Sequence, residues 1–144
     1  MKKRQSGVLL HISSLPGDYG IGSFGQSAYD FVDFLVRTKQ RYWQILPLGT
    51  TSYGDSPYQS FSAFAGNTHF IDLDILVEQG LLEATDLEGV DFGSNPEEVD
   101  YAKIYYARRP LLEKAVKRFL EVGDVKGFEK FAQENKSWLE LFAE

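Results

Sequence analysis

The apolar residues in the first half of the chain fall into a strand, a helix and a second strand. Residues 8–10 form a short apolar run, and residues 42–46 combine the aromatic and β-branched side chains typical of a buried strand. Between them, apolar residues recur at helical spacing: Phe24, Ala28, Phe31, Phe34 and Leu35. Ser23 and Gln26 have the spacing of a capping box, which predicts that the helix begins there. This order predicts a βαβ unit with two parallel strands and a right-handed crossover.

The second half of the chain has the pattern of solvated helices. Residues 74–79 predict a short helix that ends at Gly80, and Asp100 is placed to cap a helix starting at Tyr101. Pro110 is expected to kink or restart that helix. A last helix is predicted after Gly127, with an apolar face made of Phe128, Phe131, Trp138 and Phe142. It carries no terminating signal, and two parallel strands are too few for a closed sheet, so the pattern favours the N-terminal piece of a longer α/β protein.

Composition and charge narrow the classes of function. The 144 residues carry a net charge of −6, which disfavours a nucleic-acid-binding face. There is no cysteine, which excludes disulfides and cysteine-ligated metals and fits a reducing compartment. No apolar run of signal-peptide length precedes Gly7, and no window approaches the ~20 apolar residues that span a bilayer. We therefore expect a cytoplasmic protein that binds neither nucleic acid nor membrane.

The segment 49–67 differs in character from the rest of the chain. Pro47 ends the second strand because it has no N–H to donate, and small polar residues then surround four aromatics: Tyr53, Tyr58, Phe61 and Phe64. So many aromatics predict an ordered loop at the carboxyl end of a buried strand, where strand–helix barrels build their active sites. Aromatic faces beside hydroxyls and the carboxylate of Asp55 suit a sugar ring. Phe61 and Phe64 are expected to anchor the loop on the core, which leaves Tyr53 and Tyr58 for a ligand.

Two further motifs carry weaker signals. Residues 20–25 match the G-x-G-x-x-G dinucleotide fingerprint, but the first glycine does not follow the strand directly and no acid follows the second strand. These glycines are interpreted as loop geometry. His11 lies at the carboxyl end of the first strand, where a structural hydrogen bond and a role in a site are open alternatives. His69 is interpreted as structural, and two histidines without a partner motif do not make a metal site.

Two carboxylates could in principle serve glycosidic chemistry. Cleavage with retention needs an acid/base and a nucleophile about 5–5.5 Å apart. In the strand-bearing half, only Asp18 and Asp55 lie in loops at the correct end. Two alternatives to a part of a larger enzyme therefore stay open: a small glycoside hydrolase that uses Asp18 and Asp55, and a free-standing glucan-binding module without catalysis.

Long stretches of the sequence resemble a known enzyme family. Residues 7–25 are GVLLHISSLPGDYGIGSFG, residues 42–67 are YWQILPLGTTSYGDSPYQSFSAFAGN, and VDY and SWLELFA follow at 99–101 and 137–143. Together they resemble the start of the amylomaltases, the bacterial 4-α-glucanotransferases. The resemblance implies that residues 1–73 are the first βαβ part of a (β/α)₈ barrel with a glucan-binding loop at 49–67. Residues 74–144 would begin a mainly helical insertion subdomain.

The resemblance also implies an activity and roles for individual residues. The family transfers α-1,4-glucan segments between maltooligosaccharides through a covalent glycosyl-enzyme intermediate, and no cofactor is expected. The tyrosine of SPYQS, here Tyr58, would pack on the sugar at the cleavage point, and Ser56 would contact glucan. Tyr53 would lie near a further glucan contact, and Asp55 would bind a sugar hydroxyl or cap its own turn.

No catalytic residue is expected within the chain. The family takes its nucleophilic aspartate, its acid/base glutamate and a further aspartate from later barrel strands. The chain is therefore predicted to need the remainder of the same barrel for folding as well as for activity.

Overall fold

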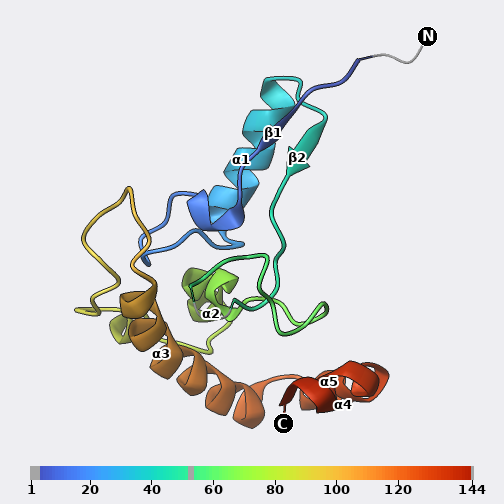
Figure 1. Ribbon diagram of the computed structural model, residues 1–144. Coiled ribbons are helices and arrows are strands. Elements are labelled where there is room, and N and C mark those ends of the chain that lie inside the picture. The colour runs from blue at the N-terminus through green and yellow to red at the C-terminus, as the bar shows by residue number, and fades with distance from the viewer. Residues whose placement is uncertain (1–3, 52–53, 144) are drawn as a thin grey trace.

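The fold is α/β, and a computed structural model describes residues 4–51 and 54–143 (Figure 1). Two short strands and the helix between them are followed by a long loop and a mainly helical second half. The elements in order are β1 (Gly7–Leu9), η1 (Ile12–Ser14), α1 (Gln26–Arg37), β2 (Tyr42–Gln44), η2 (Thr68–Phe70), α2 (Leu73–Glu78), η3 (Ala84–Asp86), α3 (Tyr101–Val122), α4 (Val125–Glu134) and α5 (Lys136–Ala143).

The two strands confirm the predicted parallel pairing. Gly7, Val8 and Leu9 lie opposite Tyr42, Trp43 and Gln44. The ladder extends one hydrogen bond further at the carboxyl end, where the Leu10 N–H donates to the Gln44 carbonyl at 3.0 Å. Each strand has only three residues, so the prediction that β2 continues to Leu46 was too long. Because the strands are parallel, the residues that follow Leu9 and Gln44 nevertheless lie at the same, carboxyl edge of the sheet.

The predicted capping box at the start of α1 was wrong. The helix begins at Gln26 with Gly25 as its N-cap, and no side chain caps it. Ser23 instead donates its hydroxyl to the carboxylate of Asp72, which also accepts the Ile75 N–H at the start of α2. A hydrogen bond from a hydroxyl to a charged carboxylate is stronger than one between neutral groups. Gly25 is needed at this contact, because a Cβ there would lie 1.9 Å from an oxygen of Asp72.

One helix of the second half has its predicted cap, and the bounds of the helices differ from the prediction. Asp100 caps α3 as expected, by accepting the Lys103 N–H at 3.0 Å. The helix then runs for 22 residues through Pro110, so of the two alternatives at this proline, a kink or a restart, the restart was wrong. The single last helix was also wrong: Gly127 lies inside α4, and Asn135 separates α4 from α5. The Asn135 side chain bonds to both helices: it donates to the Phe131 carbonyl in α4 and accepts from the Trp138 indole N–H in α5.

The apolar core consists of two clusters, and α3 contributes to both. The first cluster lies under the strand ends and contains Ile12, Leu15, Ile21, Ala28, Phe70 and Ile104. The second contains Leu73, Leu82, Phe92, Leu111 and Ala115. Burial along α3 ends at Ala115, and neither α4 nor α5 has a buried residue. The two clusters join residues from both sides of position 73, and the predicted division at this position stays a prediction.

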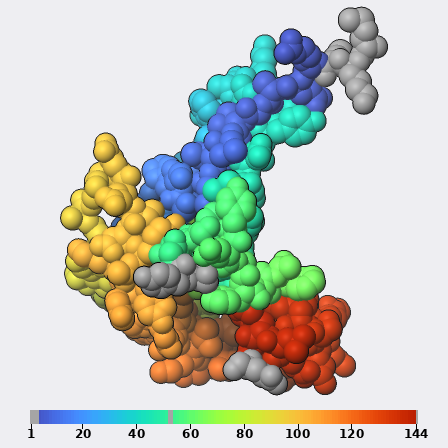
Figure 2. Space-filling model, in the orientation of Figure 1, coloured from blue at the N-terminus to red at the C-terminus, as the bar shows by residue number. Residues whose placement is uncertain are grey.

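The space-filling view shows where the C-terminal helices lie. In Figure 2, α4 and α5, in red, lie below the light green part of the 49–67 loop. The contact between the two includes the rings of Phe64 and Trp138, which stack with centroids 5.8 Å apart. Within the described ranges, every helix is too short or too polar to cross a lipid bilayer.

Candidate functional site

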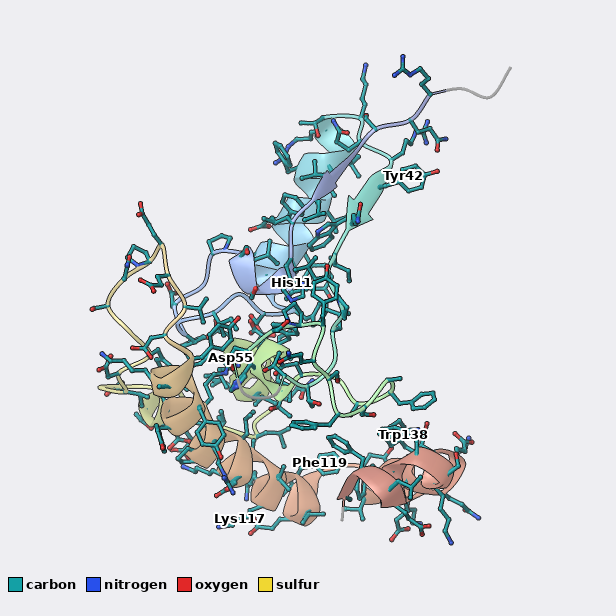
Figure 3. The ribbon with its side chains drawn as sticks, in the orientation of Figure 1. His11, Tyr42, Asp55, Lys117, Phe119 and Trp138 are labelled. Atoms are coloured by element: carbon teal, nitrogen blue, oxygen red, sulfur yellow. The ribbon has the colours of Figure 1, made fainter. Side chains whose placement is uncertain are left out.

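The carboxyl ends of β1 and β2 meet at a small cavity of about 230 Å³. His11 and the last two residues of η1, Ser13 and Ser14, reach it from β1, and Leu46 and Pro47 reach it from β2. The loop supplies Thr51, Asp55 and Pro57, and the cavity is completed by Asn67, Phe70 and Tyr101. Figure 3 shows His11 at the end of β1 with Asp55 below it, on the side toward α3. The sequence therefore brings two of its candidate residues, His11 and Asp55, to one cavity.

His11 joins the ends of the two strands. Its Nδ1 accepts the backbone N–H of Leu46 at 3.3 Å, and its ring meets the edge of Phe70 with centroids 5.3 Å apart. Burial lowers the pKa of His11. The imidazole is therefore neutral at pH 7, and an Nδ1 that accepts leaves its proton on Nε2. His11 thus has the structural hydrogen bond that the sequence suggested, and it lines the cavity as well.

The loop 49–67 closes on itself where it leaves and returns to the core. Gly49 and Gly66 form an antiparallel bridge, and the Asn67 N–H donates to the Leu48 carbonyl at 2.8 Å. The side chain of Asn67 then accepts the His69 N–H at 2.9 Å and so caps η2. Gly49 has no room for a side chain, since a Cβ would lie 2.4 Å from the Ser60 hydroxyl.

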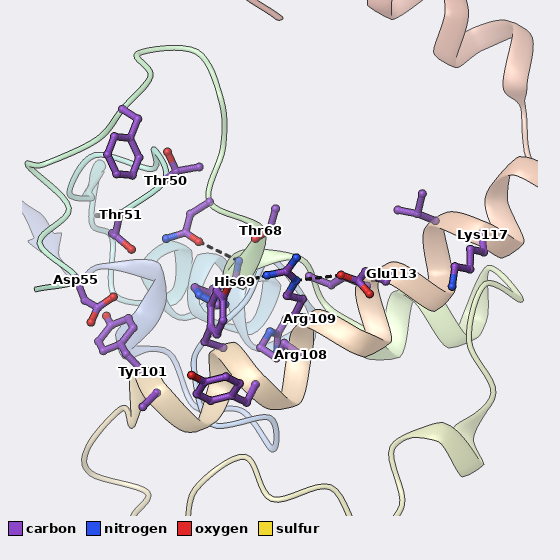
Figure 4. Close-up of a pocket in the computed structure, with 17 residues that line it drawn as sticks. Thr50, Thr51, Asp55, Thr68, His69, Tyr101, Arg108, Arg109, Glu113 and Lys117 are labelled. Carbon is purple, nitrogen blue, oxygen red and sulfur yellow. Dashed lines mark hydrogen bonds and ion pairs between the residues drawn. The ribbon is translucent and has the colours of Figure 1, made fainter. Parts of the chain in front are cut away.

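A larger cavity of about 1200 Å³ lies between this loop and α3 (Figure 4). Four residues line both cavities: Thr51, Asp55, Asn67 and Tyr101. The wall of α3 adds aromatic rings at Tyr105 and Tyr106 and charged groups at four positions: Arg108, Arg109, Glu113 and Lys117. The two cavities together have a mainly apolar lining with a few polar and charged groups, which is the usual make-up of a ligand-binding cavity.

The charges in the larger cavity are unequally compensated. Arg109 donates to Glu113 at 2.9 Å and to the Tyr105 hydroxyl at 2.7 Å, and these bonds raise the pKa of Arg109. Arg108 is fully buried and donates to the Ile71 carbonyl. Burial lowers the pKa of Arg108 to about 10, against the opposing effect of Asp72 and Tyr19. Arg108 is therefore still charged at pH 7, in a setting that disfavours the charge.

The surroundings of the cavity also shift the pKa values of two neutral side chains, His69 and Tyr101. Burial, and then the charge of Arg108, lower the pKa of His69, while Asp55 raises it. Burial, and then Asp55, raise the pKa of the Tyr101 hydroxyl. Among the described residues, no group of three or more His, Cys, Asp or Glu side chains is placed to hold a metal ion.

Three of the remaining sequence candidates, Ser56, Tyr58 and Asp18, line neither cavity. The Ser56 hydroxyl accepts the Tyr58 N–H at 3.4 Å within the turn, and the Tyr58 side chain is 72% exposed. Neither residue lines either of the two cavities. Tyr53 lies outside the described residues. Asp18 lines neither of the cavities that Asp55 lines, so the structure does not bring these two carboxylates to a shared cavity.

The predicted anchoring role of Phe61 and Phe64 was wrong. Their side chains are 75% and 70% exposed, and Phe64 stacks on Trp138 of α5 rather than on the core. The core under the loop is already filled by Phe70 and Ile12, so the tip aromatics have no buried surface to cover. An aromatic side chain in a loop is thus no sign of burial by itself.

Sequence reasoning missed the contribution of α3 to the site. Ile104, Leu111 and Ala115 have helical spacing and mark the buried face, and Arg108 shares that face because it lies four residues after Ile104. An arginine in an apolar stripe is the signal that could have found this residue. Tyr101 could have been found from its place one residue after the helix cap.

Comparison with known proteins identifies the family of the chain. The profile of glycoside hydrolase family 77, described as 4-α-glucanotransferase, matches residues 10–144. The chain belongs to the 4-α-glucanotransferase family. Within this family, it is 92% identical over 144 residues to a 4-α-glucanotransferase of Streptococcus pneumoniae, covering 100% of this chain and 28% of the relative. It is 57% identical over 134 residues to a 4-α-glucanotransferase of Clostridium butyricum, covering 93% of this chain and 27% of the relative.

A solved structure from the same family has a closely similar fold. The amylomaltase from Streptococcus agalactiae in complex with acarbose superposes with a TM-score of 0.89 at 60% sequence identity. The match covers 93% of this chain and 27% of the amylomaltase. The chain thus spans a little over a quarter of the length of the 4-α-glucanotransferases that it resembles.

Proposed function

We propose that this chain is the N-terminal part of a longer 4-α-glucanotransferase, in which it supplies the first two strands of a (β/α)₈ barrel. The observation that carries the proposal is the meeting of His11, from the end of β1, with the loop that follows β2 around one cavity. The carboxyl ends of parallel barrel strands are where such enzymes place their sites. Membership of the 4-α-glucanotransferase family supports the reaction.

The proposed substrates are maltooligosaccharides or α-1,4-glucans, and the proposed chemistry is a retaining double displacement. A carboxylate attacks the anomeric carbon while a carboxylic acid protonates the departing glucan oxygen. The hydroxyl of a second glucan, deprotonated by the same acid/base, then displaces the enzyme carboxylate. The acceptor is therefore a sugar hydroxyl in place of water, and the glycosidic bond is re-formed with retention.

The residues of this chain are proposed to bind glucan and to leave the reacting groups to the rest of the protein. The exposed ring of Tyr58 offers an apolar face to the sugar at the cleavage point, and Ser56 offers a hydrogen bond beside it. Tyr53, Asp55 and His11 are proposed as further contacts. Of the two carboxylates in the larger cavity, Glu113 is paired with Arg109, and this leaves Asp55 without the second carboxylate that catalysis needs.

Incubation with maltotriose tests the proposed reaction directly. The full-length protein should release glucose and form longer maltooligosaccharides in matching amounts, because each cleavage ends in a transfer. The chain of residues 1–144 alone should form neither product, since it lacks the proposed nucleophile and acid/base. Products limited to glucose and maltose would indicate hydrolysis. Turnover by the 144-residue chain that Asp55→Asn abolishes would favour the small hydrolase.

A further inference from the structure

The rings of Phe64 and Trp138 form a contact between the tip of the 49–67 loop and the C-terminal helices. They stack with centroids 5.8 Å apart and planes 24° from parallel. Figure 3 shows Trp138 on the side of α5 that faces the loop. Phe64 is 70% exposed and belongs to neither apolar cluster of the core. The stack therefore holds the loop tip from outside the core.

The indole ring of Trp138 is itself held in place. Its Nε1–H donates to the side-chain oxygen of Asn135 at 2.9 Å, and its backbone N–H donates to the Asn135 carbonyl at 3.2 Å. The ring also lies beside that of Phe142, with centroids 6.5 Å apart. A hydrogen bond and a packed neighbour leave the ring few orientations, so it presents a defined face to Phe64.

The helices that carry Trp138 are joined to the end of α3, outside the core. Neither α4 nor α5 has a buried residue. Phe128 of α4 meets the edge of the Phe119 ring of α3, with centroids 6.3 Å apart. Gly123, between these helices, has no room for a side chain, since a Cβ would lie 2.3 Å from the Phe119 ring. The stack on Phe64 therefore connects the loop tip to the end of α3 through α4 and α5.

Hydrogen bonds within the loop tip connect Phe64 with Tyr58. The Phe64 N–H donates to the Ser62 hydroxyl at 3.1 Å, and the Ser60 hydroxyl donates to the Ser62 carbonyl at 2.7 Å. Tyr58, two residues before Ser60, donates its own N–H to the Ser56 hydroxyl at 3.4 Å. These bonds are all local, so they shape the tip without fixing its orientation relative to the core. The stack on α5 supplies a fixed point for that orientation.

We propose that Trp138 is a positioning residue for the loop tip: by stacking on Phe64, it keeps the ring of Tyr58 in the orientation that takes the sugar at the cleavage point. The inference rests on the proposed function, because it concerns the support of a ring that the proposed reaction uses. Trp138 lines neither of the two cavities, so its effect reaches the sugar through Phe64 and the tip. Loss of the stack would alter the geometry of the reacting bond, where small displacements are costly.

A double-mutant cycle between Trp138 and Tyr58 in the full-length protein tests this role. Trp138→Leu should lower kcat/KM on maltotriose by roughly three- to ten-fold, the range expected for one aromatic pair. In the Tyr58→Ala background, the same change should lower kcat/KM by less than about two-fold, because no ring is left to position. Equal losses in the two backgrounds would overturn the proposal. A gain of activity in Trp138→Leu would also overturn it, since the stack would then hold the tip away from the sugar.

Two matched phenylalanines separate the stack from a general disturbance of the C-terminal helices. Both are partly exposed, but Phe64 stacks on Trp138, whereas Phe131 in α4 has no aromatic partner among the described residues. Phe64→Leu should lower kcat/KM as much as Trp138→Leu does, and Phe131→Leu should change kcat/KM by less than about two-fold. Trp138→Phe keeps a flat ring and should stay within about two-fold of the parent. Equal losses in Phe64→Leu and Phe131→Leu would contradict a role of the stack.

Amide hydrogen exchange of the full-length protein tests the contact without an assay of transfer. Trp138→Leu should speed exchange in peptides that cover residues 58–65 and lower the melting temperature by no more than about 2 °C, because the stack lies outside the core. Unchanged exchange at the tip would overturn the proposal even if activity fell. If the parent forms no transfer products, the proposed function fails and the role of Trp138 fails with it. If the parent transfers glucan and the cycle shows equal losses, only the role of Trp138 fails.

Discussion

The ends and the tip of the 49–67 loop are built in different ways. At the ends, Ala65 and Asn67 are buried, and backbone hydrogen bonds tie the loop to Leu48 and across the Gly49–Gly66 bridge. At the tip, the rings of Tyr58, Phe61 and Phe64 are at least 70% exposed. The comparison shows that the loop is fixed through its backbone, and that its aromatic side chains are left for other contacts.

Serine hydroxyls hold the tip in place of apolar packing. Ser60 donates to the Ser62 carbonyl at 2.7 Å, and the Ser62 hydroxyl accepts the N–H groups of Phe64 and Ala65 at 3.1 and 3.0 Å. Such local side-chain bonds stabilise turns without a hydrophobic core. The tip can therefore keep a defined shape while its aromatic rings face outward.

The largest effect expected from this difference is on stability. Phe70, in η2 directly after the loop, is 5% exposed and packs its ring against His11 and Phe24. In the full-length protein, Phe70→Ala should lower the free energy of unfolding by about 3–5 kcal/mol, because it leaves a cavity in the core. Phe61→Ala is the matched control at the tip and should change the free energy of unfolding by less than about 0.5 kcal/mol. Urea unfolding of the two variants measures both.

If Phe70→Ala and Phe61→Ala lowered the free energy of unfolding equally, the loop tip would not differ from the buried residues next to it. A loss at Phe61 as large as the loss at Phe70 would mean that residues beyond 144 cover the loop tip. The tip would then be a packing surface, and Tyr58 would be a packing residue and not a ligand contact.

A smaller effect is expected from the pH dependence of the buried end. Burial lowers the pKa of His11 from the value of about 6.5 in the unfolded chain, so the folded state binds fewer protons between the two values. The contribution of His11 to stability is full above about pH 6.5 and falls as the pH drops toward the folded pKa, by at most about 1.4 kcal/mol per pH unit. His11→Asn keeps an acceptor for the Leu46 N–H but does not titrate. Between about pH 7.5 and pH 5.5, unfolding of this variant should depend less on pH than that of the parent, and an equal slope would refute the assignment.

The sequence predicted the framework of the fold because the relevant signals are local. Apolar runs and helical spacing gave the parallel pairing of β1 with β2, and Asp100 marked the start of α3. The capping box failed because the partner of Ser23 is Asp72, 49 residues away, and a local motif carries no information on such a contact. The break at Asn135 was missed although its signal is local, since asparagine is a weak helix former and is favoured at helix ends.

The candidate site was predictable in part. The position of His11 and Asp55 followed from the rule that loops at the carboxyl ends of strands meet. The exposure of Phe61 and Phe64 did not follow, because it depends on how much of the core the residues of η2 already fill. The apolar stripe of α3 signalled that Arg108 is buried, but its contacts did not follow from the sequence, since Ile71 and Asp72 come from a segment far from α3 in the chain.

The kinetics of Tyr58 variants in the full-length protein test the central claim, that the exposed loop tip binds glucan, most directly. Tyr58→Ala should lower kcat/KM on maltotriose by roughly ten-fold to a few hundred-fold, or about 1.4–3.5 kcal/mol, because it removes a stacking face and loosens the reacting bond. Tyr58→Phe should lower kcat/KM less, because it keeps the ring. Ser56→Ala should have the smallest effect on kcat/KM, because it removes one hydrogen bond. Since Tyr58 is 72% exposed, the melting temperature should stay the same. Full activity in Tyr58→Ala, or a loss of activity that only follows a loss of stability, would contradict the account.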